Sequence, residues 1–167
     1  MVFSLVQKIR PFVLADSDQL IELWKGLQIS QVDPLVGEPA HLTTEENVAR
    51  FREFVTAVHR EDKNQILVAE LDGKLIGYTI SRKQVDFPLE TTYKWAMITD
   101  LFIHPEHRRK GIATELLQRN IQYLKSSGVT QVRINVLQNN KVAISLYHKF
   151  GFEDHTLTLQ KRPSVCT

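Results

Sequence analysis

Two apolar runs separated by Asp72-Gly73 constrain the fold of this chain more than any other feature. The runs are residues 66–71 and 74–81. Asp-Gly accepts the positive backbone angles that a tight two-residue turn requires, and short apolar runs on either side of such a turn are typical of paired strands. The sequence therefore predicts an antiparallel hairpin in the middle of the chain.

A third strand is predicted at residues 95–104. This run is almost wholly apolar except for Thr99 and Asp100, and Pro105 ends it because proline cannot continue the ladder of hydrogen bonds. We expect this strand to be central and buried on both faces.

A helix and a further strand follow in succession. Residues 111–126 carry apolar side chains at helical spacing, and a strand is predicted at residues 131–137. Asn139 or Asn140 caps a last predicted helix, and a closing strand is expected to run to about residue 160.

The first part of the chain adds a strand at residues 6–13 and a helix capped by Asp16 or Asp18. Residues 28–42 contain several turn formers and are predicted to be a loop. Thr43-x-x-Glu46 then predicts a capping box that opens a second helix. Together these elements predict a mixed α/β sheet.

Length and composition predict a single domain over residues 1–167. A chain of 167 residues buries roughly 70% of the surface that its unfolded form exposes. The contents of 43% hydrophobic and 24% charged residues are ordinary for a soluble globular protein, and the net charge of +2 does not indicate generic binding of nucleic acid.

Neither a disulfide framework nor a targeting segment is predicted. The chain has 1 cysteine, Cys166, so an intramolecular disulfide and a cysteine-based metal cage are excluded. Residues 1–8 lack the basic-then-apolar order of a signal peptide, and no apolar run reaches the ~20 residues of a membrane helix. These features predict a cytoplasmic protein without membrane partners.

The segment 105–114 carries the strongest signal for chemistry. It joins a predicted strand to a predicted helix, and the free N–H groups at a helix start favour an anion. Gly111 and Ala113 permit close approach of a pyrophosphate, while neighbouring cationic side chains add positive charge. These are Arg108, Arg109 and Lys110. Taken without its context, the same basic run is more typical of a solvated turn.

Other phosphate and metal motifs are missing. No Gly-x-x-x-x-Gly-Lys-Ser/Thr run and no Gly-x-Gly-x-x-Gly run after the first strand occurs, which argues against nucleotide hydrolysis and dinucleotide binding. The 6 histidines show no paired ligand spacing, so no metal site is predicted.

In its context, residues 98–114 resemble the acetyl-coenzyme A motif of the GNAT superfamily of N-acetyltransferases. That motif, Arg/Gln-x-x-Gly-x-Gly/Ala, is satisfied by Arg108, Gly111 and Ala113, where the commonest pattern has glycine at the last position. Residues 140–152 resemble the second motif of the family. The resemblance implies an α/β fold with a mixed, mostly antiparallel twisted sheet, a parallel and splayed central strand pair, and about four flanking helices.

The resemblance also implies where acetyl-coenzyme A binds. The pantetheine arm would meet backbone groups of Leu101, Phe102 and Ile103, with Asn140 and Ala143 nearby. The pyrophosphate would be held by the amides of Arg109, Lys110, Gly111, Ile112, Ala113 and Thr114.

Two residues are candidates for proton transfer. The resemblance places Tyr147 near the thioester sulfur, where a phenol can act as general acid, and Asn140 shares its helical face because the two are about two turns apart. Asp100 is the only acidic residue of the central strand, and burial could raise its pKa into the range of a general base. Strand alternation puts Asp100 on the face of Ile98 and Phe102. A structural role for Asp100, bonded to neighbouring backbone, is an equal alternative.

These features predict an N-acetyltransferase that moves an acetyl group from acetyl-coenzyme A to a primary amine of a small molecule or peptide by direct attack in a ternary complex. A non-catalytic module that binds or senses acyl-coenzyme A is the alternative, and a nucleic-acid module using the basic run is a third. The resemblance is compatible with a homodimer through the last strands.

Acceptor choice is expected to depend on loops at 29–42 and 83–94, where carboxylates could attract a cationic amine. These are Asp33, Glu38, Asp86 and Glu90.

Overall fold

The computed structural model describes residues 8–30, 43–61, 64–85 and 94–158. The chain forms two compact units, a sheet unit of residues 1–137 and a C-terminal unit of residues 138–167. The prediction of one domain over 1–167 stays a prediction.

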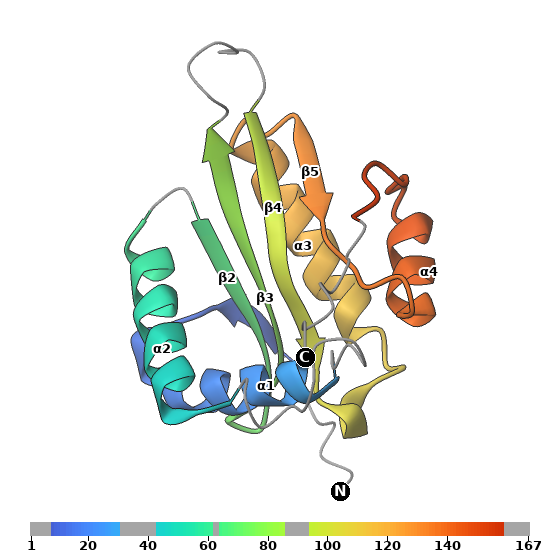
Figure 1. Ribbon diagram of the computed structural model, residues 1–167. Coiled ribbons are helices and arrows are strands. Elements are labelled where there is room, and N and C mark those ends of the chain that lie inside the picture. Colours follow the sequence, from blue (N-terminus) through green and yellow to red (C-terminus); the bar gives the residue numbers. More distant parts are fainter. Residues whose placement is uncertain (1–7, 31–42, 62–63, 86–93, 159–167) are drawn as a thin grey trace, which may run out of the picture. The chain divides into compact units, whose positions relative to one another are not determined.

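The sheet unit is built on a five-stranded sheet in the order β1-β2-β3-β4-β5. Its strands are β1 Lys8–Pro11, β2 Asn64–Leu71, β3 Lys74–Val85, β4 Lys94–Ile103 and β5 Gln131–Ile134. Neighbouring strands pair antiparallel from β1 to β4, whereas β4 and β5 pair parallel (Figure 1). The mixed, mostly antiparallel sheet is thus confirmed.

Three helices of this unit cover the two faces of the sheet. These are α1 Ser17–Ser30, α2 Glu45–Arg60 and α3 Ile112–Ser126. Apolar residues of α1 and α2 form one core with the sheet, and α3 forms a second core on the opposite face (Figure 1). Across the described ranges, no helix is both long and apolar enough to span a membrane.

The hairpin of β2 and β3 forms where the sequence predicts it. Leu71 pairs with Lys74, and both turn residues have positive φ, 50° at Asp72 and 77° at Gly73. These are the angles that Asp-Gly tolerates at little cost, so this turn fixes the register of the two strands.

A bulge at Thr99 interrupts the alternation of β4. Asp100 pairs with Ile80 of β3 whereas Ile98 pairs with Ser81, so Thr99 is the extra residue. Ser81 bonds Asn120 of α3, which places Ser81 and its partner Ile98 on the α3 face. Strict alternation would put Asp100 on the face of Ile98, and that expectation is wrong. Asp100 instead shares the opposite face with Phe102.

The burial of β4 differs on its two faces. Ala96 and Ile98, on the α3 face, are 0% and 1% exposed, whereas Trp95, Met97 and Asp100 on the other face are half-buried. The expectation that this strand is buried on both faces is therefore wrong for its first half.

Several predicted boundaries need correction. Helix α2 begins with Thr44 as its N-cap, whose hydroxyl accepts the N–H of Asn47, so the helix is capped by Thr44 and not by the predicted Thr43. Asp16 caps a short 3-10 turn by accepting the N–H of Val13 and also pairs with Arg10.

The end of the chain also departs from the prediction. Strand β5 ends at Ile134, three positions before the predicted end at Leu137. Residues 152–158 form no strand, so the described part of the predicted closing strand is wrong.

Candidate active site

Helix α3 begins with an open amino end at Gly111. The first intrahelical hydrogen bond runs from the N–H of Glu115 to the carbonyl of Gly111 at 3.0 Å, so the N–H groups of Ile112, Ala113 and Thr114 stay outside the bonding of the helix itself. Gly111 has φ 81°, which disfavours any residue with a Cβ, and a Cβ added there would meet no atom within 4 Å. The helix start is therefore open to an anion, and its N–H groups and dipole suit a phosphate.

The basic residues before the helix have different roles. The Nε of Arg108 donates to the carbonyl of Ile103 at 3.0 Å, and its guanidinium lies 5.5 Å from the centre of the Phe102 ring. Arg108 therefore fastens the loop to the end of β4. Arg109, with φ 61°, and Lys110 are exposed and leave their charges free for solvent or a ligand.

The second half of β4 has a free edge beside this loop. Strand β5 pairs only with Trp95 to Ile98, whereas β4 continues to Ile103. Backbone groups of 99–103 on that side consequently have no strand partner among the described residues. This is the splayed geometry expected for Leu101, Phe102 and Ile103, although Arg108 already occupies the carbonyl of Ile103. Their side chains are core residues, as expected.

Asp100 lies on the face of β4 opposite α3, next to a buried tyrosine. Its Oδ1 lies 3.4 Å from the hydroxyl of Tyr78, a long hydrogen bond, and Tyr78 is 0% exposed. Burial raises the pKa of Asp100, and hydrogen bonds from Thr99 and Tyr78 oppose that rise. Burial likewise raises the pKa of Tyr78, so its hydroxyl keeps its proton. A carboxyl with a raised pKa suits proton transfer.

The C-terminal unit contains the remaining candidates on helix α4 Lys141–Lys149. Asn140 is the N-cap, and its Oδ1 accepts the N–H of Ala143 at 3.1 Å, which confirms the predicted cap and brings these two residues together. Tyr147 is 8% exposed, and its ring lies edge-on to Phe152 at 5.9 Å. Burial raises the pKa of Tyr147 to about 12.

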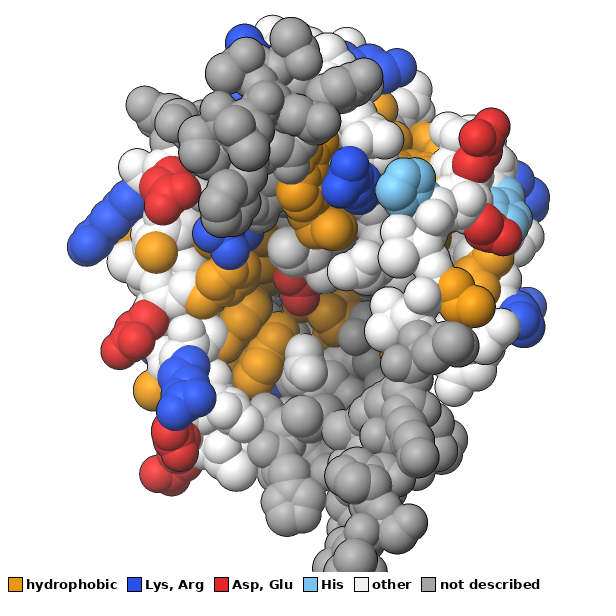
Figure 2. Space-filling view, turned by 45° about the horizontal axis from the view of Figure 1, so that its top comes forward, with side chains coloured by type: hydrophobic (Ala, Val, Ile, Leu, Met, Phe, Trp, Pro, Cys, Tyr) orange, Lys and Arg blue, Asp and Glu red, His pale blue; other side chains and the backbone are white. Residues whose placement is uncertain are grey.

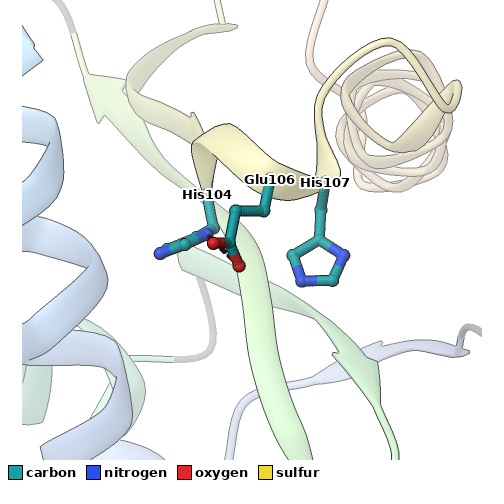
Figure 3. Close-up of side chains that lie close together, drawn as sticks. All are labelled: His104, Glu106 and His107. Carbon is teal, nitrogen blue, oxygen red and sulfur yellow. Dashed lines mark ion pairs between the residues drawn. The ribbon is translucent and has the colours of Figure 1, made fainter.

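One cluster of potential metal ligands lies on the turn before the basic loop. His104, Glu106 and His107 each offer an atom within 4.8 Å of the others. The His104 Nδ1 and the Glu106 Oε2 are 4.0 Å apart, and the two rings point in different directions (Figure 3). Ligands of a tetrahedral zinc, at ~2.0–2.1 Å from the metal, lie ~3.4 Å apart. The ligand atoms of this cluster, as placed, are therefore more widely spaced than those around a bound zinc.

The sequence did not predict one buried polar contact or the role of two arginine side chains. Asn120 of α3 is 0% exposed and links the hydroxyls of Ser81 and Thr79, a role that an asparagine in an apolar helical face could have suggested. Arg82 and Arg133 flank Met97 on the face of the sheet opposite α3, an arrangement that only the strand register reveals. The four carboxylates expected to attract an acceptor lie outside the described residues.

Comparison with known proteins points to one family. Residues 27–152 match the family model described as the acetyltransferase (GNAT) family. An N-alpha-acetyltransferase of Sulfurisphaera tokodaii is 32% identical over 100 residues, which cover 57% of this chain and 60% of that protein. The chain thus matches less than two thirds of the length of this relative.

Solved structures share the fold. An aminoglycoside N-acetyltransferase, AAC(6')-Iy in complex with CoA, has a TM-score of 0.73 at 15% identity, with 99% of each chain covered. The PaiA N-acetyltransferase of Thermoplasma acidophilum, in complex with coenzyme A, has a TM-score of 0.74 at 22% identity, covering 92% of this chain and 93% of that one.

Proposed function

Because the chain belongs to the acetyltransferase (GNAT) family, whose model covers residues 27–152, we propose that it moves an acetyl group from acetyl-coenzyme A to a primary amine. The observation that carries this proposal is the open start of α3 at Gly111 next to the free edge of β4. Together these offer N–H groups for a pyrophosphate and an unpaired strand edge for an extended amide chain.

The residues that would hold acetyl-coenzyme A fit its chemistry. The amides from Arg109 to Thr114 would bind the pyrophosphate, and backbone groups of 101–103 would bind the pantetheine arm. Asn140 and Ala143 are proposed to contribute from α4. When bound, acetyl-coenzyme A supplies the thioester from which the acetyl group is transferred.

Direct transfer in a ternary complex is the mechanism we favour. The chain's 1 cysteine is the penultimate residue, far in sequence from both motifs. No cysteine lies near the motifs in sequence to carry the acetyl group, so the amine itself would form the new C–N bond as the C–S bond breaks.

The acceptor amine must first lose a proton. An alkyl ammonium with a pKa of ~10.4 needs roughly 4 to 5 kcal/mol to do so near pH 7. Asp100 is our candidate base, directly or through water, because burial raises its pKa toward that of a useful base. Its contact with Tyr78 keeps the carboxylate oriented.

Tyr147 is the proposed general acid. With its pKa raised to about 12 by burial, the phenol is protonated throughout the physiological range. Tyr147 would donate its O–H proton to the sulfur as the C–S bond breaks, so that coenzyme A leaves as the thiol, and solvent would return a proton to the phenolate.

The test is release of free thiol from acetyl-coenzyme A with a panel of primary amines that includes an alkylamine, a polyamine, an aminoglycoside and a peptide. Release that depends on one class of amine would support the proposal and identify that class. Tight binding of acetyl-coenzyme A without release for any amine would contradict acetyl transfer and favour the sensing module.

A further inference from the structure

A row of three residues crosses the sheet where β3, β4 and β5 lie side by side. Arg82 of β3 pairs with Met97 of β4, and Met97 pairs in turn with Arg133 of β5. Paired residues on adjacent strands project from the same face, so two guanidinium groups flank Met97. The backbones of Arg82 and Arg133 are two strand spacings apart, roughly 10 Å. Two arginine side chains can close this distance.

This row lies on the face opposite α3. The guanidinium of Arg82 lies 5.5 Å from the ring centre of Phe54 on α2, and that of Arg133 lies 4.4 Å from the ring centre of Trp95. The intervening residues Ala96 and Val132 pack instead with Leu124 of α3. The arginines therefore belong to the same face as Asp100.

The described residues leave the face around the row only partly covered. The residues of this part of the sheet face are half-buried, whereas Ala96 and Ile98 of β4 on the α3 face are buried. The half-buried residues are Arg82, Trp95, Met97 and Arg133. In Figure 1 the upper parts of β4 and β5 are not covered by α1 or α2. Hydrophobic side chains are exposed on this side, with basic side chains beside them and an acidic side chain among them (Figure 2).

Both guanidinium groups keep hydrogen-bonding capacity. Stacking on an aromatic ring uses the face of a guanidinium and leaves its N–H edge available to an oxyanion. The Nε of Arg82 is buried without a hydrogen-bond partner. The side chain of Arg133 is held by the Oε1 of Gln131, at 3.3 Å from Nε and 2.9 Å from one terminal nitrogen.

The charges of the row have no ion-pair partner in the part of the chain that the structure describes. Within the described ranges, neither Arg82 nor Arg133 forms an ion pair with a carboxylate, although other arginines such as Arg10 and Arg119 do. Two guanidinium groups on a half-buried face, without a carboxylate partner among the described residues, favour a carboxylate or phosphate ligand.

From these observations we propose that the acceptor is an amine that also carries an oxyanion, bound between Arg82 and Arg133 with its amine directed toward Asp100. This inference rests on the proposed acetyl transfer. Asp100 lies three positions along β4 from Met97, roughly 10 Å, so the amine and the oxyanion are separated by several bonds. A tail of about five carbons covers part of this distance, and the Arg82 or Arg133 side chain must swing from its aromatic contact to cover the rest.

The test compares four amines that share a five-carbon chain: n-pentylamine, cadaverine, 5-aminopentanoate and 5-aminopentyl phosphate. Thiol release gives kcat/KM for each with the wild-type chain and with Arg82→Gln, Arg133→Gln and the control Arg50→Gln. Arg50 is an exposed residue of α2 paired with Glu46, so the control removes one positive charge away from the row.

We expect the anionic amines to be preferred over n-pentylamine by about tenfold or more, with cadaverine poorest, since a charged hydrogen bond is usually worth this factor. Either row variant should lower the ratio of anionic to neutral kcat/KM by about tenfold, and Arg50→Gln should leave that ratio unchanged. If added salt lowers the preference for the anionic amines, the result supports an electrostatic origin of that preference. Comparison of 5-aminopentanoate with 5-aminopentyl phosphate identifies which oxyanion fits better.

Equal or better use of n-pentylamine or cadaverine would overturn the inference while leaving acetyl transfer intact. If no amine is acetylated, calorimetric binding of 5-aminopentanoate and 5-aminopentyl phosphate separates the two proposals. If the wild type binds these compounds and Arg82→Gln and Arg133→Gln do not, the oxyanion site is supported although acetyl transfer is not. Absence of binding to wild type would reject the site. Circular dichroism checks that each variant is folded.

Discussion

Tyr147 is held in its protonated form by burial, so its contribution to turnover should be separable from binding. Because its pKa is raised to about 12, the phenol loses its proton only as the pH rises through about 12. We expect Tyr147→Phe to lower kcat by about 10²-fold, a typical factor for a positioned general acid, with little change in the Kd of acetyl-coenzyme A.

Steady-state kinetics and calorimetry on the same preparations check this prediction. Tyr123→Phe, on α3, is the matched control and should keep wild-type turnover. Full turnover of Tyr147→Phe across the pH range would remove the general-acid assignment.

Asp100 should leave a signature in the pH dependence of stability. Burial raises its folded-state pKa above the unfolded value of ~3.9, so the folded chain binds more protons between the two values. Stability associated with this group is therefore greatest below the unfolded pKa and falls as the pH rises through the folded pKa. Asp100→Asn cannot ionise and should lack that fall.

Thermal unfolding from pH 4 to pH 9 measures the effect as the difference in Tm between wild type and Asp100→Asn. The variant should gain relative stability as the pH rises. A constant difference would contradict the raised pKa. If Asp100 is also the base, kcat/KM of the wild type should increase as the pH rises through the same folded-state pKa.

At the scale of the elements, Gly77 allows β3 and β4 to approach near the proposed pantetheine edge. A Cβ at Gly77 would lie 2.5 Å from the Cδ1 of Ile103 and 2.9 Å from the carbonyl oxygen of Phe102. Gly77→Ala should therefore cost about 1–3 kcal/mol of unfolding free energy. Urea unfolding measures this cost, and adding Ile103→Val should recover part of it because Cδ1 is removed. An unchanged midpoint for Gly77→Ala would show that the strands are less closely packed.

Asn120 joins α3 to β3 through hydrogen bonds that no solvent can replace. Its Oδ1 accepts from the Ser81 hydroxyl at 2.8 Å, and its Nδ2 donates to the Thr79 hydroxyl at 3.1 Å. Asn120→Leu keeps the volume but removes the acceptor of the Ser81 hydroxyl, whereas the Thr79 hydroxyl still donates to the Asp100 carbonyl at 2.9 Å. We therefore expect a loss of about 1–3 kcal/mol in urea unfolding. Gln118→Leu, at an exposed position of the same helix, should lose less than about 0.5 kcal/mol. Similar losses for both variants would contradict the buried network.

The elements that sequence predicts well are those with a local cause. Asp72-Gly73 sets the hairpin because its backbone angles are set by two residues, and Asn140 caps α4 through its own side chain. The bulge at Thr99 has no comparable local signal, because it depends on how β4 fits β3. For that reason the face of Asp100 relative to Ile98 could not be obtained from alternation alone.

At the scale of the whole molecule, the same distinction applies to the site. The start of α3 was predictable because Gly111 and the basic run are contiguous in sequence. The row of Arg82, Met97 and Arg133 joins three strands distant in sequence, so it is visible only after folding. The homodimer stays a prediction, and sedimentation over a concentration series tests it.

Binding of acetyl-coenzyme A to the start of α3 is the central claim for the whole molecule. Gly111 and Gly73 form a matched pair, with φ 81° and 77° and open space around both, so alanine at either position imposes a similar backbone strain. Only Gly111 lies at the proposed pyrophosphate site.

The most direct measurement is calorimetric titration of acetyl-coenzyme A into the wild-type chain, Gly111→Ala and Gly73→Ala. We predict that the wild type and Gly73→Ala bind with equal Kd, and that Gly111→Ala binds at least about tenfold more weakly, a loss of ~1.4 kcal/mol. No binding to the wild type, or equal binding to all three, would contradict the account.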